Sequence, residues 1–486
     1  MIAAGTTYYW TSAFTGFRVT GSLDNAGLLW ATATAAASPV ELADGGSLSN
    51  SGTIVAEVEA GAATTVNAEW AMAAGEIANS GDLFALAAAG NAIGIRVWQP
   101  GYTIENSGTI AVQAFDDPAS PNDAWGTLTS GKAIGIFVGG GDVPIVNHAP
   151  GQILVEGDHA FGMWLRGSGA GASYAFDLDN QGLIKAASTL EGSPSCGLYL
   201  VETAGQQMRV LNSGTIDADV AIFAPSEGPE TLFSDITYGS ESITNTASGI
   251  VRGSIELRNG DDLLVNYGHV SGKVDMGPGD DTVDTSGGSL EGLVYLGLGD
   301  DLFLGSAAAD RATGDGGNDR LEGNSGDDLL LGGVGDDVLI GGSGNDGLYG
   351  EFGNDRLVIE GGDQALGGAG DDRLELTDYS FELADGGDGI DMLVLPAGTR
   401  LIDLAKVAGS GRVTDVEGLV LGGDKELVVR SSDIGSITGG SSLRIDALAT
   451  DKVDLVGAWL ERAEQVIGGV TYRVFAGGRR EPARRC

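Results

Sequence analysis

A strict period of nine residues constrains the fold of this chain more than any other feature of its sequence. Five segments follow one another without a gap over residues 314–358: GDGGNDRLE, GNSGDDLLL, GGVGDDVLI, GGSGNDGLY and GEFGNDRLV. In each segment, six turn residues rich in glycine and aspartate precede three residues that include a large apolar one. Turns and short strands that alternate at a fixed spacing indicate a solenoid of stacked coils. We expect two segments, or 18 residues, to form one coil.

The glycines and leucines of these segments have separate roles in the expected coil. Glycine is needed because the turns require backbone angles and close approaches that other residues do not tolerate. The apolar residue of each short strand should point inward and stack on its equivalent in the next coil. The expected inner ladder consists of Leu321, Leu330, Leu339, Leu348 and Leu357.

The segments match the pattern G-G-x-G-x-D-x-U-x, in which U is a large apolar residue. GGSGNDGLY from Gly341 and GGDGIDMLV from Gly386 fit every position. The stretch therefore resembles the RTX (haemolysin-type) calcium-binding repeats. The resemblance implies a β-roll in which several calcium ions, as cofactors, lie between stacked turns. Backbone carbonyls and two aspartate carboxylates can supply there the six or so hard oxygen ligands that calcium prefers.

A step of about 18 residues sorts the aspartates onto two edges of the solenoid. One edge is expected to carry Asp262, Asp281, Asp301, Asp319, Asp337, Asp355, Asp372 and Asp391. The other edge has Asp328 and Asp346, and its next member would be Gln364 in the degraded segment IEGGDQAL, where carboxylate ligation should stop. The glycines expected to shape the metal sites are Gly314, Gly317, Gly323, Gly326, Gly332, Gly333, Gly335, Gly341, Gly342, Gly344, Gly350, Gly353, Gly367, Gly368, Gly370, Gly386, Gly387 and Gly389.

The charge of the chain also favours cations as partners. The formal net charge is -42, and residues 251–395 alone carry 31 acidic and 7 basic side chains. Such a charge repels nucleic acid and anionic membranes. Without calcium the stacked aspartates should repel one another, and the repeat segment should be expanded and disordered.

A second repeat fills roughly residues 20–258. Its core is an apolar residue, a spacer, asparagine, a short turn and an apolar strand, as in LSNSGTI. The asparagines are Asn25, Asn50, Asn79, Asn106, Asn147, Asn180, Asn212 and Asn245. Asparagine and glycine both suit sharp turns, so stacked turns can form an asparagine ladder. A second motif follows in four coils, as AIGIRV, AIGIFV, AFGMWL and CGLYLV, and an extra loop is expected within residues 114–132. These repeats resemble the β-helix passenger domains of bacterial surface proteins.

After Pro396 the glycine period ends and alternating runs such as KELVVRSSDI and GGVTYRVFAGG predict strands. This part resembles the small β module that ends many RTX proteins and large bacterial adhesins. The matching positions are Glu417, Asp433, Leu443, Ile445, Asp451, Val453, Trp459, Tyr472 and Val474. The resemblance implies export by type I secretion machinery, and the N-terminus lacks the basic and apolar regions of a cleaved signal. The ending RREPARRC departs from the apolar strand that is usual in relatives.

Several other classes receive little support from the sequence. Two cysteines, Cys196 and Cys486, cannot form a disulfide framework, and Cys196 is expected in the core. No stretch has the roughly 18 uncharged apolar residues of a membrane span. None of the three histidines lies in an H-E-x-x-H motif, and no G-x-S-x-G motif is present. A polysaccharide lyase or epimerase would need a basic residue on one coil face, for which Arg96, Lys132 and Arg166 are the candidates.

The sequence therefore predicts an all-β fold, with a right-handed parallel β-helix (1–258), a calcium-binding parallel β-roll (259–394) and a small C-terminal β module (395–486). We expect a secreted, extracellular or cell-surface protein, adhesin-like or matrix-like, that folds on calcium after export and contacts a cell-surface or polysaccharide ligand. The alternative is a secreted carbohydrate-active enzyme whose active site lies on the β-helix.

Overall fold

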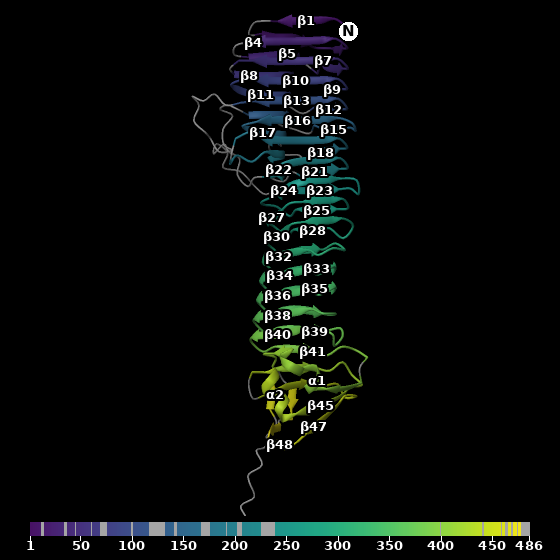
Figure 1. The fold of residues 1–486 in the computed structure, drawn as a ribbon, viewed down its shortest axis with the longest axis vertical. Helices are drawn as coiled ribbons and strands as arrows, with labels where there is room; N and C mark the ends of the chain where they lie inside the picture. Colours follow the sequence, from purple (N-terminus) through teal and green to yellow (C-terminus); the bar gives the residue numbers. More distant parts are fainter. Residues whose placement is uncertain are drawn as a thin grey trace, which may run out of the picture. The chain divides into compact units, whose positions relative to one another are not determined.

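The computed structural model confirms the expected fold class, with 62% of the residues in strands and 3% in helices. It describes residues 1–10, 14–33, 36–43, 45–59, 61–68, 75–98, 101–115, 132–139, 143–166, 175–190, 192–201, 207–224, 239–398, 400–439, 442–457, 459–461, 465–467, 470–473 and 475–477. Two compact units divide the chain, an N-terminal unit at Met1–Gly297 and a C-terminal unit at Leu298–Cys486. Each consists mainly of stacked parallel strands (Figure 1).

From Asn25 to Asn266, one strand of each coil in the N-terminal unit ends in an asparagine, whereas β28 (Thr282–Asp284) in the coil after Asn266 ends in an aspartate. The strands that end in asparagine are β3 (Ser22–Asn25), β6 (Ser47–Asn50), β9 (Gly75–Asn79), β12 (Tyr102–Asn106), β15 (Ile145–Asn147), β18 (Ala175–Asn180), β21 (Gln207–Asn212), β23 (Ser240–Asn245) and β25 (Leu263–Asn266). Neighbours pair in parallel with asparagine opposite asparagine, for example Asn147 opposite Asn180. Alternate residues of these strands point into the core, as β3 illustrates with its buried Leu23 and Asn25.

The buried asparagines form the expected ladder. Nδ2 of Asn147 donates to Oδ1 of Asn180 over 2.8 Å, and Oδ1 of Asn147 accepts from Nδ2 of Asn106 over 2.8 Å. The same bond links every neighbouring pair from Asn25 to Asn266. Asn266 is a ninth member that the repeat pattern did not predict, since it lies in LLVNYGHV, directly after the first aspartate pair of the acidic repeats. The ladder satisfies side-chain amides that would otherwise be costly to bury.

The other strands of the N-terminal unit complete its coils. The strands that follow the asparagine turn are β4 (Leu28–Ala33), β7 (Thr53–Val58), β10 (Asp82–Ala87), β13 (Thr109–Ala114), β16 (Gln152–Gly157) and β19 (Leu183–Ser188). The next strands of these coils are β5 (Ala36–Leu42), β8 (Gly61–Ala68), β11 (Gly90–Val97), β14 (Lys132–Val138), β17 (His159–Arg166) and β20 (Cys196–Val201). In later coils β22 (Thr215–Phe223) and β24 (Ile250–Glu256) pair with each other. Cys196 is buried, as expected.

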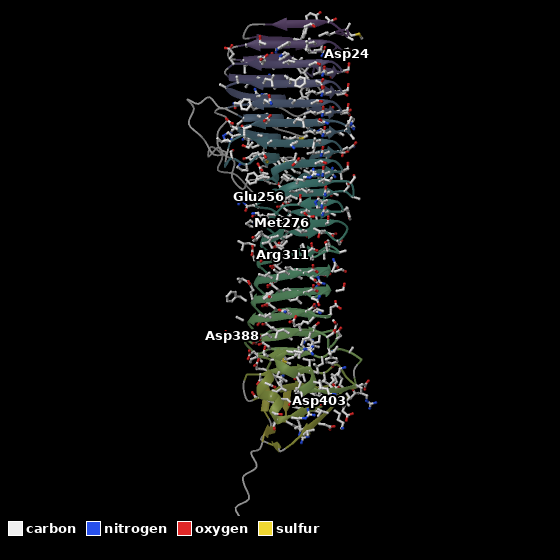
Figure 2. The ribbon with its side chains drawn as sticks, viewed as in Figure 1. Asp24, Glu256, Met276, Arg311, Asp388 and Asp403 are labelled. Carbon is white, nitrogen blue, oxygen red and sulfur yellow. The ribbon has the colours of Figure 1, made fainter. Side chains whose placement is uncertain are left out.

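Coils of the C-terminal unit contain two strands each. One sheet holds β31 (Leu302–Leu304), β33 (Arg320–Ser325), β35 (Val338–Ser343), β37 (Arg356–Ile359), β39 (Arg373–Leu376), β41 (Met392–Val394), β44 (Gly418–Val420) and β46 (Arg444–Asp446). The facing sheet holds β32 (Arg311–Gly316), β34 (Leu329–Val334), β36 (Gly347–Phe352), β38 (Gln364–Ala369), β40 (Leu383–Asp388) and β43 (Val413–Thr414). The five predicted leucines are fully buried between the sheets, which confirms the inner ladder. Figure 2 shows side chains of both units, among them Met276 and Asp388.

Beyond Pro396 the C-terminal unit adds a three-stranded parallel sheet of β42 (Leu401–Asp403), β45 (Glu426–Arg430) and β47 (Lys452–Val456). The helices α1 (Leu404–Val407) and α2 (Ser431–Ile437) contact it. Two short antiparallel pairs follow, β48 (Trp459–Glu461) with β51 (Phe475–Gly477) and β49 (Gln465–Ile467) with β50 (Val470–Tyr472). Val474 lies outside the described residues.

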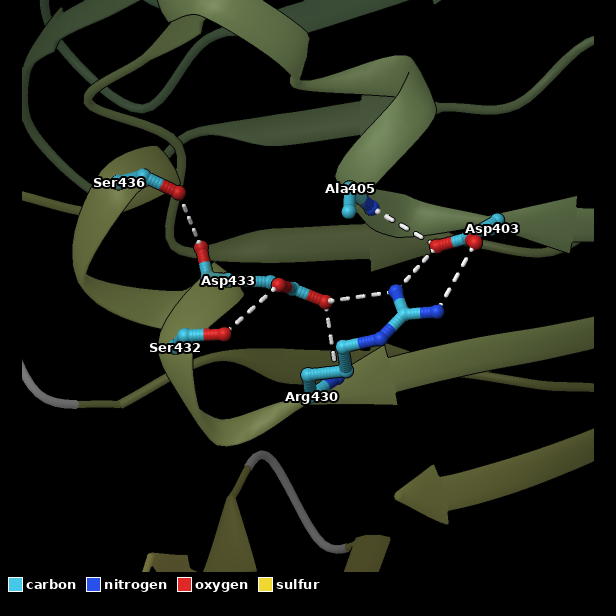
Figure 3. A network of polar contacts seen from close by, with 6 residues as sticks. All are labelled: Asp403, Ala405, Arg430, Ser432, Asp433 and Ser436. Atoms are coloured by element: carbon cyan, nitrogen blue, oxygen red, sulfur yellow. Dashed lines mark hydrogen bonds and ion pairs between the residues drawn. The ribbon is translucent and has the colours of Figure 1, made fainter. Parts of the chain in front are cut away.

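The sequence predicted that KELVVRSSDI forms a strand, and this prediction was wrong for its second half. Its strand ends at Arg430, and α2 begins at once because the Asp433 carboxylate accepts a 2.8 Å hydrogen bond from the Arg430 N–H. The Arg430 guanidinium also donates to Asp403, with Nη2 3.0 Å from Oδ2 (Figure 3). This hydrogen bond lowers the pKa of Asp403. Arg430 thus joins the end of one strand to the end of another, and the helix cap stops the strand.

Candidate metal centre

The aspartates of one edge are linked from coil to coil by hydrogen bonds. In the C-terminal unit, the backbone N–H of each member of this row before Asp391 donates to Oδ1 of the aspartate one coil further on, at 2.8 Å in all five cases. The members are Asp301, Asp319, Asp337, Asp355, Asp372 and Asp391, which we call the long row. In the N-terminal unit the Asp262 N–H donates in the same way to Oδ1 of Asp281, over 2.7 Å. The step of about 18 residues therefore sorted these aspartates correctly.

The other edge of the C-terminal unit has a row of four aspartates, which we call the short row. Asp310 donates to Asp328, Asp328 to Asp346, and Asp346 to Asp363, at 2.8 to 2.9 Å. The assignment of the next position to Gln364 was wrong. The degraded segment is one residue short, so the step from Asp346 is 17, and Gln364 lies opposite Gly347 in the strand. Asp310 was missed because no glycine turn precedes it.

In most of these aspartates, the second carboxylate oxygen has no hydrogen-bond donor within the described part of the chain. Oδ2 is buried, and the described residues offer it no donor, in Asp319, Asp328, Asp337, Asp346, Asp355, Asp372 and Asp391. Each of these residues is at most 3% exposed. Asp363 differs, since its Oδ2 accepts from the Glu360 N–H at 2.7 Å. A buried carboxylate oxygen without a donor is costly unless a cation faces it.

The first glycine of each repeat leaves the space that these oxygens face. A Cβ added to Gly350 would overlap both Oδ2 of Asp355 and the carbonyl oxygen of Gly367 in the next coil. An overlap with the aspartate of the same repeat recurs at Gly314, Gly323, Gly332, Gly341, Gly367 and Gly386. The space is therefore bordered by oxygen atoms that can only accept hydrogen bonds.

The fourth residue of the repeats holds the turns close together. Gly335 has φ +140°, and a Cβ on it would overlap the carbonyl oxygen of Gly317 in the previous coil. The equivalent predicted glycines Gly317, Gly326, Gly344, Gly353, Gly370 and Gly389 also have positive φ. Gly333, Gly342, Gly368 and Gly387 of the second position share this property, whereas Asp315, Asn324 and Glu351 adopt positive φ at the same position in other repeats.

Burial raises the pKa of these carboxyl groups. The largest cause is the loss of solvation on burial, which raises the pKa. Hydrogen bonds from backbone N–H groups have the next largest effect and lower the pKa, and neighbouring aspartates raise it again. The pKa rises to about 7 for Asp319, Asp363 and Asp391. It rises to about 6 for Asp328, Asp337, Asp355 and Asp372. Carboxylates that resist ionisation in the absence of a cation are strong candidates for a cation site.

An outer ladder runs beside the long row and alternates aspartate with asparagine. The Asn318 side chain donates from Nδ2 to Oδ1 of Asp300, and Oδ1 of Asn318 accepts from the Asp336 N–H at 2.9 Å. Asn354 and Asp371 continue the series. These residues are exposed. The alternation reduces repulsion between charges that would otherwise be stacked, and the repeat pattern did not predict it.

The residues present fit calcium better than a softer metal. Among the described residues, no group of three or more histidine, cysteine, aspartate or glutamate side chains is placed to hold a metal. A metal in the rows would therefore need backbone carbonyls besides carboxylates. Calcium accepts six to eight oxygen ligands of this kind in flexible geometry, whereas zinc prefers nitrogen and sulfur.

The three basic residues considered for an enzyme site do not lie opposite one another on neighbouring strands. Arg96 lies opposite Phe137, Lys132 opposite His159, and Arg166 opposite Val201. Lys132 is only 2% exposed, and its Nζ lies 5.3 Å from the centroid of the Trp164 ring. The structure therefore does not gather the three side chains at one point. Residues 116–131 of the expected loop lie outside the described part of the chain.

An aromatic row occupies the same sheet of the N-terminal unit. Phe137, Trp164, Tyr199 and Phe223 lie opposite one another on neighbouring strands. Their ring centroids are 6.1, 4.7 and 5.6 Å apart in that order. The first three are less than 10% exposed, at 4%, 7% and 2%. Stacked aromatic rings of this kind stabilise the sheet by cross-strand packing.

Comparisons with known proteins agree with the two kinds of coil. Residues 2–188 match the model of the BigA third pectate lyase-like domain. Residues 295–330, 322–357 and 359–376 match the RTX calcium-binding nonapeptide repeat. Neither a curated protein nor a solved structure matches the chain. Within the described residues no helix is long and apolar enough to cross a bilayer. The chain thus contains RTX calcium-binding repeats and a β-helix region, which together fit a calcium-binding β-solenoid.

Proposed function

We propose that this protein is secreted through type I machinery, folds when calcium fills its aspartate rows, and serves as an adhesin-like or matrix-like protein at the cell surface or beyond it. One observation carries the proposal: buried Oδ2 atoms to which the described residues offer no donor recur along both rows of the C-terminal unit. A chain in this state is strained by its own charge, and calcium would relieve that strain. Folding would then depend on the calcium concentration around the chain.

The rows also bear on how many ions bind. The long row offers five consecutive aspartate pairs within the C-terminal unit, and the short row offers three. If most pairs hold one ion, on the order of five to eight ions bind, a count that rests on two carboxylates for each site. The predicted site aspartates and glycines are the proposed ligands and turn residues.

The place of folding follows from the affinity expected for such sites. Extracellular calcium modules bind with dissociation constants of about 10⁻⁴ to 10⁻³ M, so they fill outside the cell and stay empty in calcium-poor cytosol. A chain exported unfolded would therefore become rigid only after export. A rigid, repetitive scaffold suits a structural or adhesive role toward a cell surface or polysaccharide. In this proposal, residues 1–258 form the β-helix, residues 259–394 the calcium-binding β-roll and residues 395–486 the C-terminal β module.

Calcium titration of the full chain tests the proposal. Far-ultraviolet circular dichroism should show a large gain of β signal as calcium is added to chelator-treated protein, and equal magnesium should give little. Limited proteolysis in chelator should cut within residues 259–394 and leave residues 1–258 intact. If chelator-treated protein keeps its full β signal and its melting temperature, the proposal is wrong.

A secreted carbohydrate-active enzyme is the second candidate, and one finding favours it: the matched family model is named pectate lyase-like. The separation of Arg96, Lys132 and Arg166 in the register argues against a shared catalytic point. A screen for unsaturated sugars released from acidic polysaccharides decides between the candidates. Turnover that is lost on Arg166→Ala or Lys132→Ala, with the β signal retained, would favour the enzyme.

A further inference from the structure

The long row does not end with its last repeat. Asp391 is the final aspartate of the row, and its N–H donates to Oε2 of Glu417 over 3.1 Å. The register places Met392 opposite Gly418, so Glu417 lies one coil beyond Asp391, where a further aspartate would stand. The glutamate therefore takes the place of the next aspartate, although 26 residues separate the two and no nonapeptide surrounds it.

A backbone carbonyl is also replaced at this coil. A Cβ added to Gly386 would overlap the carbonyl oxygen of Asp415 and lie 2.5 Å from Oδ2 of Asp391. One coil earlier, the corresponding space beside Gly367 is lined by Oδ2 of Asp372 and the carbonyl oxygen of Gly386. The Asp415 carbonyl thus stands where the repeats place a glycine carbonyl. Asp415 reaches this position with φ +48°, a left-handed conformation that is uncommon for residues other than glycine.

Asp391 itself supplies an oxygen directed into this space. The residue is fully buried, and its Oδ2 has no donor among the described residues. The end of the short row provides a comparison, because there the last carboxylate, Asp363, has its second oxygen closed by the Glu360 N–H. Glu417 is only half-buried, and the Asp391 N–H is the one hydrogen-bond donor that the described residues give its carboxylate.

We infer that Asp391, Glu417 and the carbonyl of Asp415 form an additional calcium site, which closes the long row with ligands from outside the nonapeptides. The site combines two carboxylates with a carbonyl, the same oxygen types that the repeats offer. Its remaining ligands would be water or further carbonyls. The inference rests on the proposed calcium function, and it extends that function to the segment after Pro396.

Counting bound ions tests the site. Equilibrium dialysis of the purified full chain against calcium should give one ion fewer for Glu417→Gln than for the unchanged protein, because the amide keeps the acceptor for Asp391 but loses the charge. Glu382→Gln is the matched control, since Glu382 is exposed and, among the described residues, it is bonded through its backbone N–H to the Asp363 carbonyl. It should keep every ion. Glu417→Asp, which restores the residue type of the other coils, should also keep every ion.

The outcomes separate this site from the general function. If Glu417→Gln binds as many ions as the unchanged protein, or if Glu382→Gln loses one as well, the inferred site does not exist. Circular dichroism in saturating calcium checks that Glu417→Gln has folded. If it has not folded, Glu417→Asp decides, with a full complement supporting the site and one ion fewer overturning it. An unchanged protein that binds no calcium refutes the proposed function itself.

Discussion

Replacing one aspartate in the middle of the long row, and comparing it with a replacement at the surface, should show whether the loss of a buried carboxylate weakens calcium binding more than the loss of an exposed one. Asp337→Asn keeps Oδ1, which accepts the 2.8 Å hydrogen bond from the Asp319 N–H, and replaces the buried Oδ2 by an amide nitrogen. Asp336→Asn changes the adjacent, exposed residue of the outer ladder, where asparagine already stands in neighbouring coils as Asn318 and Asn354. The two variants have the same net charge.

The expected loss can be worked from the pairing. Asp337 belongs to two aspartate pairs, one with Asp319 and one with Asp355. A site filled at 100 times its dissociation constant stabilises the folded chain by about 2.7 kcal/mol, so the loss of both sites costs up to about 5 kcal/mol. Asp336→Asn removes only an exposed charge and should change the free energy of unfolding by less than about 0.5 kcal/mol.

Circular dichroism during a calcium titration measures the effect as a shift of the folding midpoint. Asp337→Asn should need several-fold more calcium than the unchanged protein, and Asp336→Asn should not. In chelator, Asp337→Asn should be at least as structured as the unchanged protein. The reason is that the variant lacks a buried carboxylate that repels Asp319 and Asp355. Equal midpoints for Asp337→Asn and the unchanged protein, or equal shifts for both variants, would refute the reasoning.

Three further changes have definite expected outcomes. Gly350→Ala should remove calcium binding at its turn, because the new Cβ overlaps Oδ2 of Asp355. Gly347→Ala is the control and should be tolerated, since the nearest atoms to its Cβ are side-chain atoms at 3.2 Å. Ion counts by dialysis compare the two variants. Asn147→Ala should destabilise the N-terminal unit by about 2–4 kcal/mol, measured by urea denaturation, because two neighbouring amides each lose a partner. In chelator, lowering the pH from about 7 toward 4 should increase the β signal. Aspartates whose pKa is about 6 to 7 in the folded chain, against 3.8 for the ordinary group, favour folding when they are protonated. An unchanged or falling β signal would contradict this.

The parts of the fold that depend on local repetition were predictable from the sequence. The leucine ladder and the long row each follow from one residue type at a nearly constant spacing. The asparagine ladder follows from one recurring motif, whose neighbouring asparagines are 21 to 41 residues apart. The short row shows where prediction from a constant spacing fails. A single missing residue in IEGGDQAL shifts the register, and Asp363 rather than Gln364 then continues the row.

Other features could not be predicted because they depend on contacts that the repeat does not encode. Glu417 meets Asp391 across 26 residues of chain that contain no nonapeptide repeat, so only the folded register places it. Asp310 enters the short row although SAAAD contains no repeat. The helix at Ser431–Ile437 depends on a cap from Asp433, which a strand-like pattern of apolar residues conceals.

The asparagine ladder has a direction. Each amide gives its hydrogen to the amide of the following coil, from Asn25 onward, and at the far end Nδ2 of Asn266 donates to the Ser289 carbonyl instead. Dipoles aligned head to tail polarise one another, so each bond strengthens its neighbours by roughly 10–30%. A break at the centre of the row, as at Asn147, divides this mutual polarisation in two, while a break at Asn25 merely shortens it. Sensitivity to substitution should therefore peak in mid-row and decline toward both ends.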